Sequence, residues 1–154
     1  MEVNIEELKS FILEASRATY ASGDESIKEK QVDGSTTIRY ENGPYRFHDN
    51  YFGGEPYGGR EVVFLKDKPI WMMVYYGLVH GGSKAKELYP FLMESLSHAT
   101  PEMPFRGPEI YAKDSLSYEN KLDGTTGQFS GTEKIYQDNQ CVYEASYIGG
   151  LVDR

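Results

Sequence analysis

The hydrophobic positions of the chain change period near residue 26, and this change predicts where helix gives way to sheet. Before it, the apolar residues from Leu8 to Ala15 form one stripe at helical spacing. Asn4 precedes this stripe as a side chain able to cap a helix, with a glutamate three positions later. The pattern predicts a helix over residues 4–20.

From residue 26 onward, apolar and polar residues alternate, which is typical of strands with one buried face. Dipeptides such as Asp33-Gly34 predict tight hairpin turns between the strands. A second helix is expected over residues 86–98, although Pro90 must either kink it or belong to its first turn. The predicted strands cover residues 27–32, 36–41, 45–52, 60–65, 69–76, 115–122, 127–137 and 140–148.

Residues 71–76 depart from this alternation because they are apolar on both faces. Such a strand is expected near the centre of a sheet, with both of its faces covered. With 154 residues, of which 39% are hydrophobic and 26% charged, the chain is long enough to bury a substantial core. The sequence therefore predicts a single α+β domain over residues 1–154. Its mostly antiparallel sheet of about eight strands packs with two helices, in the order helix, five strands, helix, three strands.

Strand alternation places three carboxylates among apolar residues. Asp49, Glu61 and Glu133 are each in phase with apolar or aromatic neighbours, so we expect all three to point inward. A buried carboxylate needs a cation, several hydrogen-bond donors or a proton, and the candidate cations are Arg60 and Arg106. Two interpretations stay open: ion pairs that fix the sheet, or a pocket where carboxylates and tyrosines meet a small polar ligand.

The chain contains thirteen tyrosines, whose large rings and polar tips suit half-buried sheet faces and pocket walls. Tyr75 shares a strand face with Trp71 and Met73, and these three positions suit either a pocket wall or a core. The segment FGGEPYGGRE, residues 52–61, places four glycines around Glu55 and Tyr57. It lacks the lysine of a phosphate-binding loop, so it is either a shaped turn or a rim that contacts a ligand.

No metal site and no cofactor are predicted. His48, His80 and His98 lie in different elements and do not have the spacing of metal ligands. Cys141 is in phase with the inward-facing tyrosines of its strand, which favours a core position over a nucleophile.

The formal net charge of −8 disfavours direct contact with nucleic acid, because an acidic surface repels phosphates. The sequence shows no signal-peptide pattern and no long apolar span, and its single cysteine cannot form an internal disulfide. We therefore expect a cytoplasmic protein that does not contact membranes.

Several segments together resemble one bacterial and archaeal family, a domain of unknown function. They are TYAS at residues 19–22, HDNYFGGEPYGGREVVF at 48–64, PIWMMVYYG at 69–77, PFRGP at 104–108, FSGTEKIY at 129–136 and YIGGLVD at 147–153. In some members the domain follows an Xre-type helix-turn-helix, which implies a sensor or effector role. Here the first helix is predicted from residue 4, so a regulatory role would need a separate partner. The resemblance implies no catalytic residue.

These observations lead to three hypotheses. The first is a module that binds a small ligand or a partner in a tyrosine and carboxylate pocket. The second is an enzyme that uses the same carboxylates for acid–base chemistry without a metal. The third is a structural or interaction protein whose exposed tyrosines form a homodimer. The candidate ligand-binding residues are Asp49, Glu55, Tyr57, Arg60, Glu61, Tyr75, Arg106 and Glu133.

Overall fold

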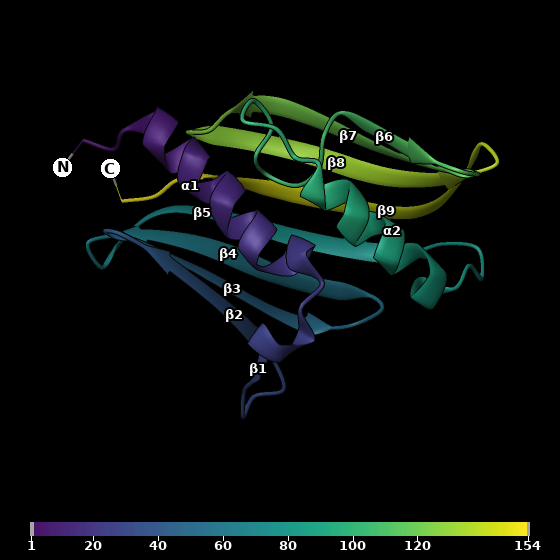
Figure 1. Ribbon diagram of the computed structural model, residues 1–154, viewed down its shortest axis with the longest axis horizontal. Helices are drawn as coiled ribbons and strands as arrows, with labels where there is room; N and C mark the ends of the chain where they lie inside the picture. The colour runs from purple at the N-terminus through teal and green to yellow at the C-terminus, as the bar shows by residue number, and fades with distance from the viewer. Residues whose placement is uncertain (1, 154) are drawn as a thin grey trace.

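The computed structural model describes residues 2–153, which form one nine-stranded antiparallel sheet with two helices on the same face (Figure 1). The strands lie in the order β1-β2-β3-β4-β5-β9-β8-β7-β6. The helices are α1 (Ile5–Ala18) and α2 (Ala85–Ser97), with two short 3₁₀ turns, η1 (Tyr20–Ser22) and η2 (Glu25–Ile27). The strands are β1 (Glu29–Lys30), β2 (Thr36–Asn42), β3 (Tyr45–Gly53), β4 (Tyr57–Leu65), β5 (Lys68–Val79), β6 (Ile110–Lys113), β7 (Leu116–Thr125), β8 (Gln128–Gln137) and β9 (Gln140–Leu151).

The predicted α+β class is confirmed, with one strand more than expected. Strand β6 has no alternating apolar pattern, and it forms because its backbone pairs with β7 at the edge of the sheet. The expected first strand is mostly absent, because residues 25–27 form η2, in which the Asp24 side chain accepts a bond from the Ser26 amide. Only two residues then pair with β2, so the link between β1 and β2 is longer than a two-residue turn.

Helix α1 begins as the sequence predicts. The Asn4 side chain accepts hydrogen bonds from the amides of Glu6 and Glu7, at 3.1 and 3.2 Å. In α2, Pro90 lies inside the helix and beyond its first turn. Neither helix of the described chain is long and apolar enough to cross a membrane.

Strand β5 lies at the centre of the sheet, as predicted, but only one of its faces is covered. Trp71 and Met73 are fully buried on the face beneath the helices, here called the inner face. On the opposite, outer face, Val74 is 46% exposed and Tyr76 is 56% exposed. The expectation of cover on both sides is therefore wrong, because both helices pack on the inner face (Figure 1).

The core consists of two apolar clusters, both on the inner face. Helix α1 packs over β3, β4 and β5, whereas α2 packs over β7, β8 and β9. The rings of Tyr20 and Tyr57 contact both clusters. The boundary between the two clusters is therefore lined by polar tips, and the buried charged residues described next gather there.

Candidate functional site

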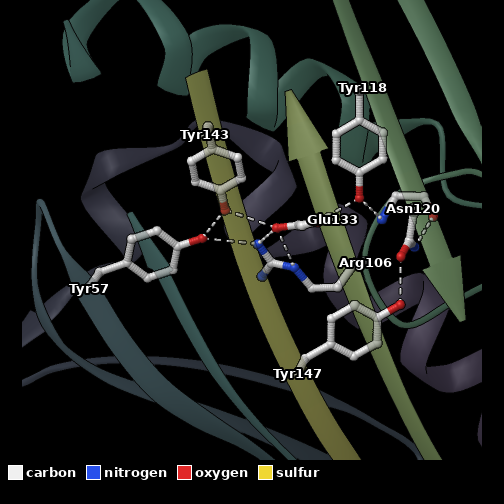
Figure 2. Close-up of polar contacts among 8 residues, drawn as sticks. Tyr57, Arg106, Tyr118, Asn120, Glu133, Tyr143 and Tyr147 are labelled. Carbon is white, nitrogen blue, oxygen red and sulfur yellow. Dashed lines mark hydrogen bonds and ion pairs between the residues drawn. The ribbon is translucent and has the colours of Figure 1, made fainter. Parts of the chain in front are cut away.

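Glu133 of β8 is the centre of a buried polar network (Figure 2). One carboxylate oxygen accepts from Arg106, whose Nε lies at 3.1 Å and Nη2 at 2.5 Å, and from the Tyr143 hydroxyl at 2.9 Å. The other oxygen accepts from the Tyr118 hydroxyl at 2.5 Å. Burial of this ion pair is compensated by these donors, because every charged atom of the carboxylate has a partner.

The loop that carries Arg106 is held by a second tier of hydrogen bonds. The Gly107 amide donates to the Tyr118 hydroxyl at 3.0 Å, and the Asn120 side chain donates to the Gly107 carbonyl at 2.9 Å. Tyr147 donates to the Asn120 side chain at 2.6 Å. These contacts hold the backbone next to Arg106 in place, and Figure 2 shows the bond between Tyr147 and Asn120.

Tyr57 connects this network to the other half of the sheet. Its hydroxyl accepts from Arg106 Nη2 at 3.3 Å and shares a short hydrogen bond with the Tyr143 hydroxyl. The ring lies over Gly77, its register partner on β5, where an added Cβ would come within 2.7 Å of the ring. A side chain larger than hydrogen at residue 77 would therefore displace Tyr57.

A second pair of carboxylates lies beside this network and is not neutralised by it. Asp49 of β3 and Glu61 of β4 are register partners, and both are buried on the inner face. Asp49 accepts from the Tyr75 hydroxyl at 2.5 Å. Neither carboxylate oxygen of Glu61 has a hydrogen-bond partner within the described residues, and the same holds for the hydroxyl of Tyr20.

The pKa values of this pair are raised by their surroundings. Burial raises the pKa of Asp49 to about 6, although the bond from Tyr75 and the charge of Arg106 act in the opposite direction. Burial and then the negative charge of Asp49 hold the pKa of Glu61 well above its usual range. Both carboxyl groups of the pair therefore hold their protons more tightly than ordinary aspartate and glutamate side chains do.

A cavity of about 350 Å³ opens over Asp49, between α2, η1 and the inner face of β2 to β5. This volume is within the range of small-molecule sites, about 300–1,000 Å³. Most of the wall is apolar or aromatic, and its polar groups include Asp49 and Arg106 deep in the fold. The lining residues are Tyr20, Lys28, Lys30, Ile38, Asp49, Tyr51, Gly53, Gly54, Tyr57, Tyr75, Tyr89, Leu92, Met93, Leu96 and Arg106.

Comparison with known proteins identifies the family of the chain. The sequence model of a domain of unknown function, DUF5680, matches residues 49–152, more than half of the chain. The chain belongs to this family. The matched range of the DUF5680 protein includes Asp49, Glu61, Arg106 and Glu133. Searches among curated proteins and solved structures found no match.

The inward orientation predicted for Asp49, Glu61 and Glu133 is confirmed. Asp49, Tyr57, Tyr75 and Arg106 all line the same cavity of the DUF5680 protein. Glu61 neighbours Asp49, and Glu133 is joined to the cavity through Arg106.

Arg60 does not belong with these residues. Its neighbour Glu61 points inward, and successive side chains on a strand point to opposite faces, so Arg60 lies exposed on the outer face. Its inclusion among the candidates was wrong, and Arg106 alone supplies the buried cation among the described residues.

The glycine-rich segment forms a short hairpin end rather than a wide excursion. Gly53 and Tyr57 are register partners, so only three residues connect β3 to β4. The exposed Glu55 accepts from the Val79 amide at 2.8 Å and from the Tyr89 hydroxyl. Glu55 thus fastens the hairpin to α2 and β5, while Tyr57 belongs to β4 and points into the cavity.

The site also contains tyrosines that sequence reasoning passed over. Tyr118, Tyr143 and Tyr147 occupy inward positions of β7 and β9, and Tyr89 lies on α2. For Tyr147, the sequence contains one indication, the glycine at position 131. Gly131 is the register partner of Tyr147 and leaves room for its ring, as Gly77 does for Tyr57. Without the register of the strands, however, the sequence does not show which tyrosine faces which glycine.

Proposed function

We propose that this DUF5680 protein is a small-ligand-binding module whose ligand occupies the cavity over Asp49. The observation that supports this proposal is the carboxyl group of Glu61, fully buried and without a hydrogen-bond partner within the described residues. An unpaired buried polar group costs free energy, about 1–3 kcal/mol in proteins. Glu61 is the register partner of Asp49, which lines the cavity, so the fold keeps this cost directly beside the proposed ligand position.

The neighbouring Glu133 shows that a buried carboxylate of this fold can be fully paired. Glu133 is equally buried, yet both of its oxygens accept hydrogen bonds and it pairs with Arg106. The Glu133 network therefore acts as support that holds Arg106 and Tyr57 in place. Asp49 is left as the carboxylate of the cavity wall that can accept hydrogen bonds from a ligand.

The chemistry of the cavity indicates what kind of ligand fits. An ionised Asp49 accepts hydrogen bonds, so the inner end of the ligand should carry donors such as an amine, amidine or amide. Tyr20, whose buried hydroxyl has no hydrogen-bond partner within the described residues, also lines this cavity. The rings of Tyr51, Tyr57 and Tyr75 favour an aromatic or apolar body. A sensor role, as implied by the resemblance to helix-turn-helix-fused members, would use this same cavity.

A fragment screen by ligand-observed NMR tests the proposal. The library should contain aromatic and aliphatic rings bearing amines, amidines or amides, with matched carboxylic acids as the comparison set. We expect donor-bearing fragments to bind and to lose at least about tenfold in affinity in Asp49→Asn, because a charge-assisted bond is replaced by a neutral one. Met93→Trp, which fills the cavity, should abolish the same binding.

Two results would count against the proposal. One is an absence of any preference between the donor-bearing fragments and the matched acids. The other is equal binding of the hits to the wild-type protein and to Met93→Trp. Chemical conversion of a bound fragment would instead favour the acid–base enzyme.

Binding of a cationic fragment should also depend on pH. The charged form of Asp49 is present above its pKa of about 6, so affinity should be constant above that value and fall below it. Each pH unit below about 6 should weaken binding about tenfold until another group titrates. Titrations between pH 5 and pH 8 measure this profile, and a profile that is equally steep in Asp49→Asn would refute the role of this carboxyl group.

A further inference from the structure

A second cluster of chemically active side chains lies on the outer face of the sheet, beside the end of β5 where Val79 binds Glu55. His80 directly follows β5, and Cys141 and Glu144 belong to β9. One ligand atom from each residue lies within 4.8 Å of the other two. The imidazole Nε2 of His80 and a carboxylate oxygen of Glu144 are 3.7 Å apart.

A β-bulge makes this cluster possible. Cys141 and Glu144 are three residues apart, which on a regular strand would place them on opposite faces. Tyr136 of β8 is the register partner of Cys141, whereas the preceding Ile135 is the partner of Tyr143. The extra residue, Val142, shifts the phase, so Cys141 turns to the outer face with Glu144. The predicted core position of Cys141 is therefore wrong, and its thiol is half-buried.

His80, the third member of the cluster, is held in place by a backbone hydrogen bond. The His80 amide donates to the Val142 carbonyl at 2.8 Å, which fixes this residue against the bulge itself. Gly81 and Gly82 follow, both with positive φ, so the chain turns away immediately after His80. The imidazole is left 37% exposed and the Glu144 side chain 42% exposed, which keeps the cluster open to solvent.

We propose that His80, Cys141 and Glu144 form a binding site for a divalent metal ion of the zinc type. Imidazole nitrogen, thiolate sulfur and carboxylate oxygen are the three donor types that Zn²⁺ takes in proteins. In tetrahedral coordination such atoms lie about 3.3–3.6 Å from one another, close to the spacing of His80 and Glu144. Three protein ligands leave a fourth position, which faces solvent and would be filled by water or by a group from another molecule.

Metal titrations of the full chain test this site. Isothermal titration with Zn²⁺ should show one metal ion per chain, and Co²⁺ should give the charge-transfer absorption band of a cobalt–thiolate bond. Cys141→Ser, His80→Gln and Glu144→Gln should each weaken Zn²⁺ binding at least about tenfold, because each removes one ligand. Cys141→Ser should also remove the cobalt–thiolate band.

His48→Gln is the matched control, since His48 lies on the same outer face but on β3. Circular dichroism of each variant establishes that it is folded, which we expect for substitutions of half-exposed residues. The proposal is overturned if the wild-type chain binds no Zn²⁺. It is equally overturned if the three variants bind Zn²⁺ as tightly as His48→Gln, or if wild-type Co²⁺ spectra lack the thiolate band.

Discussion

Replacing Glu133 with glutamine should lower the free energy of unfolding by about 3–5 kcal/mol, because it leaves the buried guanidinium of Arg106 without its counter-charge. Glutamine preserves the shape of the side chain, so the effect isolates the charge. Urea denaturation at pH 7 measures it. The variant Glu41→Gln, at an exposed position of β2, should change stability by less than about 0.5 kcal/mol.

A double-mutant cycle then separates the ion pair from its surroundings. Arg106→Gln combined with Glu133→Gln removes both charges, so the double variant should be more stable than Glu133→Gln alone. If the double variant loses the sum of the two single-variant losses in free energy of unfolding, Arg106 and Glu133 are not energetically coupled. The ion pair would then not be what holds Arg106 in place.

Replacing Glu61, in contrast, should make the protein more stable. Glu61→Met should raise the free energy of unfolding at pH 7 by about 1–3 kcal/mol, because it replaces an unpartnered buried carboxyl with an apolar chain of similar size. The same variant should bind the cationic fragments less tightly, which is the exchange of stability for function expected at a binding site. A loss of stability in Glu61→Met would show that Glu61 has a structural role.

Asp49→Asn should also stabilise the fold, with a pH dependence that follows from its pKa. The folded-state pKa of about 6 exceeds the ordinary value of 3.8, so ionisation of Asp49 works against folding as pH rises from about 4 to about 6. A shift of roughly two pKa units corresponds to about 3 kcal/mol as an upper bound. The stabilisation by Asp49→Asn should therefore be complete above pH 6 and absent below about pH 4. Urea midpoints at pH 3.8 and pH 7.5 provide the comparison.

Strand alternation was sufficient to place the buried carboxylates. Asp49, Glu61 and Glu133 each lie in strands with a regular period of two, so their inward orientation could be predicted from local pattern alone. What could not be predicted is which of them is neutralised. That depends on Arg106, whose loop reaches Glu133 through contacts far apart in the sequence.

Two of the errors, at Cys141 and at the outer face of β5, have local causes that a single sequence does not display. The bulge at Val142 reverses the phase of Cys141, and nothing in the residue types marks it. The apolar residues of β5 correctly indicated a central strand, but the pattern does not reveal whether a helix covers the second face. Arg60 was grouped with the carboxylates by charge, although its position next to Glu61 already placed it on the other face.

The proposed ligand site is tested most directly by a crystal structure of the protein soaked with its tightest-binding donor-bearing fragment. We expect electron density in the cavity, with the fragment's donor group within hydrogen-bond distance of Asp49 and beside Tyr20. The same soak of Asp49→Asn should give weak density or none. Fragment density that lies outside the cavity, or that fills it without contacting Asp49, would contradict the proposed function.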